Sequence, residues 1–321
     1  MALNVDKGAL LVRDGLTHYP QERREWRIFP GEPTRPKRII ILDGSGAVTF
    51  DAIDWLREQD IALIRVDWTG AVSVLAGAAY AADPVAWRNQ EALRSDPSRK
   101  MAIARRLIDD KLAHSVKTLQ QHVEPGAARD RAITIVREKR AFLYDRKRLT
   151  ARDIYGAEGR AAKVYFEAWV GAPVRWRGAT RRPVPDSWRS IGQRQSFATG
   201  KKGKNYNATH PVNAMLNYAY ALLEAHVRLE AIGAGYDPRS GFLHSGHQRA
   251  PALVLDLMEP LRPIVDGGVL AFIRGEVFSA ADFTLRSDGV CRLNPQLARR
   301  VADLTASTLR HAPSSLKPIK S

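Results

Sequence analysis

The stretch "RKMAIARRLIDDKLAHSVKTLQQHV", residues 99–123, marks the point where the apolar spacing of the chain changes. Its apolar side chains include Ile103, Leu107, Leu112 and Val116, with Arg and Lys residues between them. This spacing predicts an amphipathic helix, because residues three and four apart lie on one helical face. Helical patterns dominate the chain after this stretch, whereas short strand-like runs dominate before it.

The C-terminal part is therefore predicted to be mostly helical. Further helical patterns cover residues 132–145, 157–170, 210–234, 250–273 and 293–309. Each carries apolar side chains at helical spacing rather than in strict alternation. We find no internal repeat and no extended low-complexity tract.

The N-terminal part reads as a small β-rich domain. Short apolar, β-branched runs cover residues 8–15, 25–30, 38–42, 61–67 and 71–77, and Gly, Pro and Asp separate them. One helix is expected at 49–60, with Thr49 or Asp51 as its N-cap. The fold class is thus α+β, with a β-rich domain over 1–84 and a larger α-helical catalytic domain over 85–321.

Composition is that of a folded protein large enough to bury its own core. The chain has 321 residues, of which 45% are hydrophobic and 26% charged. Cys291 is the single cysteine, so no internal disulfide can form and a reducing cytoplasm is expected. Neither a signal peptide nor a bilayer-spanning apolar run is present, so we expect no membrane association.

The charge favours a polyanionic partner. Fifty Lys and Arg against thirty-four Asp and Glu give a net charge of +16, and nucleic acid is the first candidate. Nine basic residues lie between Arg175 and Lys204, against Asp186 alone. With Trp176, Trp188 and Phe197 interleaved, this loop suits phosphate binding and base stacking. A solvated flexible insertion is the alternative interpretation.

Two carboxylates stand close together in "LVLDLMEPLRP". Asp256 and Glu259 are three residues apart, so on one helix they share a face. Such a pair needs a cation, a shared proton or an arginine, and Arg262 is placed to supply the last. A surface pair with its arginine therefore remains an alternative to a functional site.

Histidines and a third acidic residue sharpen the functional interpretation. His244 follows the apolar "GFL", where a histidine in the core is a common alternative. His247 alone does not make a zinc site, because other nitrogen and sulfur ligands are missing nearby. One imidazole with carboxylates suits Mg²⁺ or Mn²⁺ instead. Glu158 shares a predicted helical face with two alanines, although the helix dipole alone also favours it there.

Four motifs together resemble one known family. They are "GFLHSGH…DLMEPLRP", "AEGRAAKVYF", "NATHPVNAMLNYAYALLEA" and the N-terminal "GAVTFDAIDWLREQDIALIRVDWTGAV". Because they follow one another along the chain in the same order as in that family, with a β-rich and then a helical part, they resemble the CRISPR-associated endonuclease and integrase family called Cas-one, the spacer-acquisition nucleases. The likeness covers nearly the whole chain.

This resemblance implies the site residues. Glu158, His244 and Glu259 fall on the family's ligand positions for Mg²⁺ or Mn²⁺, and Asp256 falls on a supporting acidic position. Glu259 takes a position where some members have aspartate. Asn217 and Tyr218 match a stretch near the DNA. The basic loop and neighbouring arginines are expected to bind DNA phosphates through Arg181, Arg182, Lys201, Lys202, Lys204, Arg249 and Arg262.

The resemblance also implies the reaction and partners. Members join the 3′-hydroxyl of a short DNA fragment to a repeat by transesterification, and cut DNA when water replaces the hydroxyl. We therefore expect double-stranded and branched DNA as partners, a homodimer joined through the β-rich domain, and the small Cas-two protein.

Other functions remain open. A transposon-type integrase shares this catalytic core, but no added helix-turn-helix segment is evident. A non-catalytic basic DNA-binding scaffold would not need Glu158, His244 and Glu259. A Ser-His-Asp hydrolase is set aside, because no G-x-S-x-G motif occurs.

Overall fold

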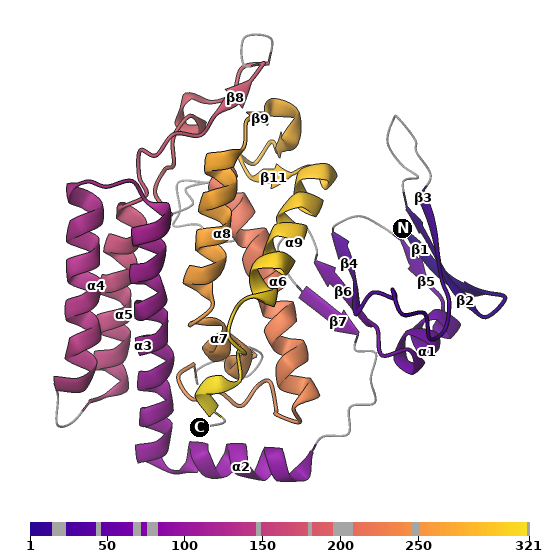
Figure 1. Cartoon of the computed structure of the whole chain (residues 1–321), viewed down its shortest axis with the longest axis horizontal. Helices are drawn as coiled ribbons and strands as arrows, with labels where there is room; N and C mark the ends of the chain where they lie inside the picture. Colours follow the sequence, from indigo (N-terminus) through magenta and orange to yellow (C-terminus); the bar gives the residue numbers. More distant parts are fainter. Residues whose placement is uncertain are drawn as a thin grey trace. The chain divides into compact units, whose positions relative to one another are not determined.

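The computed structural model describes most of the chain. The described residues are 1–14, 24–42, 46–66, 72–75, 83–145, 149–178, 182–194, 208–244 and 251–319. They belong to two compact units, Met1–Ala81 and Ala82–Ser321. The first is small and β-rich and the second is larger and mostly helical, so the predicted α+β fold class is confirmed (Figure 1).

The described residues of the N-terminal unit form two small sheets and one helix. The strand orders are β3-β2-β1-β5 and β4-β6-β7. The elements are β1 (Ala2–Asp6), β2 (Ala9–Asp14), β3 (Arg24–Ile28), β4 (Arg38–Leu42), β5 (Ala47–Val48), α1 (Phe50–Glu58), β6 (Ala62–Val66) and β7 (Val72–Leu75). All five predicted strands and the predicted helix are present, whereas β1 and β5 lie outside the predicted runs.

Local chemistry explains how this unit closes. Lys7 and Gly8 have φ angles of 50° and 79°, which allow β1 to turn directly into β2. The side chain of Thr49 accepts a hydrogen bond from the Ala52 amide at 3.2 Å and so caps α1. Trp55 on α1 packs into the core and donates from Nε1 to the Gly8 carbonyl at 2.9 Å.

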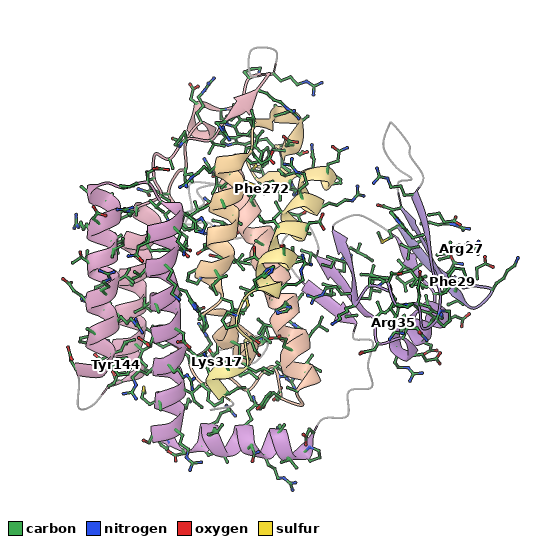
Figure 2. The ribbon with its side chains drawn as sticks, viewed as in Figure 1. Arg27, Phe29, Arg35, Tyr144, Phe272 and Lys317 are labelled. Carbon is green, nitrogen blue, oxygen red and sulfur yellow. The ribbon has the colours of Figure 1, made fainter. Side chains whose placement is uncertain are left out.

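β3 is the exposed edge of the first sheet. Trp26 on this strand is 46% exposed, and Phe29, directly after the strand, is 55% exposed. Figure 2 labels Phe29. An open edge with aromatic side chains is typical of an interaction surface, because its unpaired backbone groups are available to another chain.

Helices dominate the C-terminal unit. They are α2 (Pro84–Ser95), α3 (Pro97–His122), α4 (Ala127–Asp145), α5 (Ala151–Glu167), α6 (Pro211–Gly233), α7 (Ala252–Met258), α8 (Arg262–Gly275) and α9 (Pro295–Arg310). The 3-10 turns are η1 (Asp186–Trp188), η2 (Ala280–Asp282) and η3 (Lys317–Ile319). Short strand pairs join β8 (Trp176–Arg177) to β9 (Phe278–Ser279) and β10 (Phe283–Leu285) to β11 (Cys291–Leu293).

α3 is the central helix of this unit. It packs against α4 and α5 on one side and against α8 on the other, while α6 packs against α7, α8 and α9 (Figure 1). The side chain of Asp96 caps the start of α3 by accepting hydrogen bonds from the amides of Ser98 and Arg99. The predicted apolar stripe is buried, which confirms the amphipathic helix. α2, by contrast, lies where the sequence indicated only a boundary.

The stretch 250–273 was expected to be one continuous helix, and this expectation is wrong. α7 ends at Met258 and α8 begins at Arg262. Pro260 has no amide hydrogen to donate, and Pro263 lies in the first turn of α8, where proline is favoured. Glu259 therefore lies in the break between two helices rather than on a shared helical face with Asp256.

Within the parts of the chain that the structure describes, no helix is long and apolar enough to cross a bilayer.

Candidate active site

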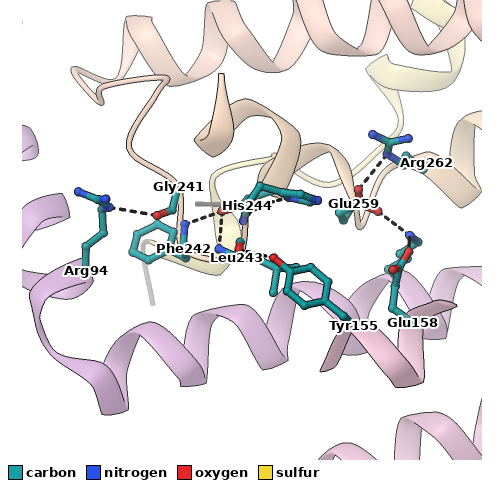
Figure 3. Close-up of polar contacts among 11 residues, drawn as sticks. Arg94, Tyr155, Glu158, Gly241, Phe242, Leu243, His244, Glu259 and Arg262 are labelled. Atoms are coloured by element: carbon teal, nitrogen blue, oxygen red, sulfur yellow. Dashed lines mark hydrogen bonds and ion pairs between the residues drawn. The ribbon is translucent and has the colours of Figure 1, made fainter. Parts of the chain in front are cut away.

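Asp256 on α7 is the buried carboxylate that organises one half of the site. It is 0% exposed and accepts backbone hydrogen bonds from Phe242, Leu243 and His244 at 2.5, 2.9 and 2.9 Å. Its Oδ1 also lies 2.6 Å from Nδ1 of His244 (Figure 3). The carboxylate therefore fixes both the backbone of 242–244 and the imidazole, and Nε2 is the ring nitrogen that this contact does not use.

The hydrogen bond to Asp256 also changes the acidity of His244. It raises the pKa of the imidazole above its ordinary value, and this outweighs burial, which lowers it. The charges of Asp256 and Glu259 raise the pKa further, whereas Arg262 lowers it. His244 consequently binds a proton more readily than a free histidine, and ligand binding at Nε2 must compete with that proton.

α2 holds the segment that leads to His244. Gln90 is 1% exposed, and its Nε2 donates to the carbonyl oxygens of Asp237 and Ser240 at 3.0 and 2.7 Å. Its Oε1 accepts from the Asp237 amide at 2.9 Å. Arg94 donates from Nε to the Gly241 carbonyl at 3.0 Å (Figure 3). A helix that the sequence did not predict thus anchors the residues before His244.

Two further contacts fix this segment. Tyr155 on α5 donates its hydroxyl to the Leu243 carbonyl at 2.5 Å (Figure 3). Gly241 is required by close approach, because a Cβ there would lie 2.8 Å from Oδ2 of Asp256 and 2.7 Å from the Ala252 carbonyl carbon. Hydrogen bonds with α2, α5 and α7 therefore hold residues 237–244 in place.

The second half of the site is a pair of glutamates joined by one lysine. Nζ of Lys111 on α3 lies 2.5 Å from Oε1 of Glu158 on α5 and 2.6 Å from Oε2 of Glu259. Arg262 at the start of α8 lies 3.2 Å from Glu259 through Nε (Figure 3). Residues from three helices and the α7–α8 break thus meet in one place.

These partners govern the ionisation of the pair. Burial would raise the pKa of Glu259, but Arg262 and Lys111 outweigh it and hold that pKa at about 2. Burial lowers the pKa of Lys111, but Glu259 and Glu158 raise it above its ordinary value. Glu259 is therefore a carboxylate, and Lys111 an ammonium, at neutral pH.

A pocket adjoins this cluster. It encloses about 680 Å³, including space open to solvent, and Lys111, Glu158 and Glu259 line one part of it. α3, α5, α6 and α8 all contribute to its lining. The carboxylates thus face a cavity large enough to admit part of a ligand.

The far wall of the pocket holds a buried acid. Asp266 is 1% exposed and accepts hydrogen bonds from the hydroxyls of Tyr165 and Tyr220 at 3.0 and 2.6 Å. Burial raises the pKa of Asp266 to about 6, although the two hydroxyls and nearby arginines lower it. Burial is also the largest cause of the raised pKa values of both tyrosines.

We expect Asp266→Asn to change how stability depends on pH. A carboxyl whose folded-state pKa is raised from 3.8 to about 6 loses stability as the pH rises between those values. From pH 3 to pH 7 the free energy of unfolding of the variant should therefore gain about 3 kcal/mol relative to wild type. Urea unfolding across this range measures it, and a difference that stays constant with pH contradicts the raised pKa.

The predicted site residues are only partly brought together. Glu158 meets Glu259 through Lys111, and His244 meets Asp256. Of the predicted DNA-binding residues, Asn217 accepts from Arg194 at 3.2 Å, and Tyr218 is 7% exposed within α6. Arg262 pairs with Glu259, as the alternative interpretation of that carboxylate expected. Arg182 is exposed, and Arg181, Lys201, Lys202, Lys204, Arg249, His247 and Phe197 lie outside the described residues.

The expectation that Trp176 and Trp188 are free for base stacking is wrong. Their rings stack on each other at 5.8 Å, and both contact Phe283. Trp188 is 5% exposed and donates its Nε1 to the Thr209 carbonyl. The two rings form the apolar core around β8 to β10 instead, where their area is removed from water.

The carboxylate pair fits a hard divalent cation. Two oxygens, from Glu158 and Glu259, converge on a single cationic atom of Lys111, and carboxylates are the ligands that Mg²⁺ and Mn²⁺ prefer. Among the described residues, however, no group of three His, Cys, Asp or Glu side chains is placed to hold an ion. His244 as the third ligand therefore stays a prediction.

Sequence reasoning missed two residues of the site, Lys111 and Asp266. Lys111 is 47 residues from Glu158 and 148 from Glu259, so local spacing could not connect it to them. Asp266 follows Arg262 by one helical turn, and an acidic residue inside an apolar helix is a signal that could have drawn attention to it.

Comparison with known proteins gives the family. The family model described as CRISPR associated protein Cas1 matches residues 32–306. A CRISPR-associated endonuclease Cas1 from Thermus thermophilus is 32% identical over 93% of this chain and 83% of its own. A casposase bound to its integration product has a TM-score of 0.77 at 25% identity, covering 98% of this chain and 81% of that one. A Cas6-RT-Cas1–Cas2 complex contains a chain with a TM-score of 0.69 at 18% identity, covering 97% of this chain and 31% of that one.

The fold and the site thus define a two-part protein with an acidic cluster on its helical unit. The chain belongs to the CRISPR-associated protein Cas1 family, which confirms the family that the sequence motifs indicated.

Proposed function

We propose that the protein is a metal-dependent DNA endonuclease and integrase of CRISPR spacer acquisition. It joins the 3′-hydroxyl ends of short DNA fragments to a repeat array by transesterification. One observation carries the proposal: Glu158 and Glu259 converge on one cationic atom at the edge of a pocket, in a member of the Cas1 family with a net charge of +16.

Glu158, His244 and Glu259 are the residues that would hold Mg²⁺ or Mn²⁺. When bound, such an ion supplies Lewis-acid stabilisation to the phosphodiester that reacts. Two features of the chain prepare these ligands. Asp256 orients the His244 ring through Nδ1, and Lys111 and Arg262 keep Glu259 ionised.

Positive side chains would bring the DNA phosphates to this place. Lys111, Arg194 and Arg262 line the pocket beside the carboxylates, and Arg194 belongs to the basic loop 175–204. Phosphate contacts position DNA without reading its sequence. If about eight phosphates are neutralised, the logarithm of the binding constant should fall with the logarithm of the salt concentration at a slope of roughly −7.

Nicking of supercoiled and branched DNA tests the endonuclease activity. We expect nicking in Mn²⁺ that is abolished by EDTA and by Glu158→Gln, while salt-dependent DNA binding persists in that variant. A wild type that binds DNA but never cuts it, in Mn²⁺ or Mg²⁺, supports the non-catalytic scaffold instead.

A transposon-type integrase is the second candidate, because the similar casposase was solved with its integration product. Both functions use the same acidic site and differ in the DNA that they join. Two integration reactions separate these functions, one with a plasmid that carries CRISPR repeats as the target and one with a fragment that carries transposon ends as the donor. Preferred integration at repeats favours spacer acquisition.

Partners are proposed on the same family relationship. The β-rich unit would join two copies into a homodimer, and the exposed side chains of Trp26 on β3 and of Phe29 directly after it support this. The small Cas-two protein would complete the assembly. Sedimentation of wild type and Trp26→Asp tests the dimer: we expect a twofold mass for the wild type and a weaker association for the variant.

A further inference from the structure

Arg194 occupies an unusual place beside the carboxylate cluster. Its guanidinium lies 5.8 Å from the ring centre of Phe166 and 5.6 Å from that of Tyr220. Nη2 donates to Oδ1 of Asn217 at 3.2 Å, but Nη1 is buried and has no hydrogen-bond partner in the described part of the structure. A buried guanidinium donor without an acceptor is costly, which indicates that an acceptor binds there.

A second donor without a partner lies nearby. Trp169 is 2% exposed, and among the described residues its indole Nε1 has no hydrogen-bond partner. Trp169 and Arg194 both line a smaller pocket, whose volume of about 200 Å³ includes space open to solvent. Phe166 and Arg194 line this pocket and the larger one that holds Glu158 and Glu259, so the two pockets adjoin.

Lys111, Arg194 and Arg262 are cations that line the larger pocket, and among the described residues Arg194 is the one of these three that forms no ion pair. Lys111 contacts Glu158 and Glu259, and Arg262 pairs with Glu259. Asp266 is occupied by two tyrosine hydroxyls. Within the described residues Arg194 is in no ion pair, and its one hydrogen bond goes to a neutral amide oxygen.

The unused groups are donors only. Nη1 of Arg194 and Nε1 of Trp169 can each give a hydrogen bond and cannot accept one. Both the O6/N7 edge of guanine and the phosphodiester present acceptors alone, and of these only the phosphodiester carries the negative charge that complements a guanidinium. Arginine is also the side chain best suited to bind phosphate oxygens.

We propose that Arg194, assisted by Trp169, binds a phosphate of the DNA strand adjacent to the phosphodiester that reacts at Glu158 and Glu259. This inference rests on the proposed function and specifies how the same site binds its DNA substrate. Phe166 and Tyr220 flank the guanidinium and hold its plane. Arg194 thus sets the register of the strand against the acidic cluster and acts as a positioning residue.

Single-phosphate neutralisation tests this assignment. Labelled duplexes with free 3′-hydroxyls carry one methylphosphonate at each successive position near the reacting end, and binding is followed by fluorescence anisotropy. In wild type we expect one position to weaken binding by about tenfold to a hundredfold, the effect of losing one charge-assisted hydrogen-bond contact. Arg194→Met should weaken binding of unmodified DNA similarly and lose sensitivity at that position alone.

Matched variants separate this role from folding and from general charge. Arg105→Met also removes a guanidinium over a ring, at 4.9 Å from Tyr144, but outside both pockets. It should keep the wild-type methylphosphonate profile. Trp169→Phe retains the aromatic packing, removes one donor and should weaken the same position partially. Thermal unfolding checks each variant, and Arg194→Lys, which retains the charge, should restore part of the position-specific sensitivity.

The possible outcomes are distinct. A methylphosphonate profile in Arg194→Met identical to wild type overturns the phosphate assignment, even if the enzyme cuts and joins DNA normally. A wild type that neither binds nor cuts DNA overturns the proposed function, and the inference with it. A position-specific sensitivity that only Arg194→Met and Trp169→Phe diminish supports the assignment.

Discussion

Asp256→Ala is expected to lower the free energy of unfolding by about 3 to 5 kcal/mol and to abolish metal-dependent DNA cleavage. The carboxylate is fully buried and satisfies three backbone amides and Nδ1 of His244. Its removal leaves these donors without an acceptor in a water-poor place. The imidazole then loses both its orientation and its negative neighbour, so the pKa of His244 falls.

The pH dependence identifies the His244–Asp256 pair as one source of this stability. Because the folded-state pKa of His244 is raised, the contribution of the pair is fully present below pH 6.5 and is lost as the pH rises through that raised pKa. NMR titration of the ring and urea unfolding measure both effects. Asp303→Ala, at an exposed position of α9, should stay within about 0.5 kcal/mol of wild type. An unchanged His244 pKa in Asp256→Ala contradicts this account.

Glu259→Gln is expected to have a comparable effect on stability and to abolish cleavage and joining. The substitution keeps the shape of the side chain but removes the charge between Lys111 and Arg262. A shift of the Glu259 pKa from 4.5 to about 2 corresponds to about 3 kcal/mol. This contribution is fully present above pH 4.5 and is lost as the pH falls through about 2.

The difference in the free energy of unfolding between Glu259→Gln and wild type should therefore be largest at neutral pH and become smaller in acid. Glu224→Gln removes another ion pair, to Arg228 on the same helix, and should cost at most about 1 kcal/mol. Calorimetric titration with Mn²⁺ should show weaker binding for Glu259→Gln and wild-type binding for Glu224→Gln. Equal Mn²⁺ affinity in all three proteins would exclude Glu259 as a ligand.

Local patterns in the sequence predicted most of the fold. Apolar spacing identified α3, and Thr49, one of the two N-caps expected, caps the start of α1. The break at Glu259 was missed because apolar residues at helical spacing continue on both sides of Pro260. The prediction followed this spacing and did not consider that Pro260 has no amide hydrogen for a helical hydrogen bond. α2 was missed because small residues and two prolines, Pro84 and Pro97, indicated only a boundary, whereas these prolines lie in the first turns of α2 and α3.

Only those site residues that lie in the family motifs could be predicted from the sequence. The family resemblance pointed to Glu158, His244, Asp256 and Glu259, and the structure places them in two pairs. Lys111 could not be found, because its link to the glutamates depends on the packing of α3 against α5 and the start of α8. The burial of Trp188 was equally hidden, since a Trp in a basic loop reads as exposed until its packing partners are known.

Strand transfer tests the central claim most directly. A labelled short duplex with free 3′-hydroxyls is incubated with a supercoiled plasmid carrying repeats, in Mn²⁺, with and without the small partner protein. Wild type is compared with Glu158→Ala, His244→Ala and Glu259→Ala. We predict joined product with wild type, none with the three variants, and salt-sensitive DNA binding by all four. Unchanged joining in the variants, or no joining by wild type under either condition, would contradict the account.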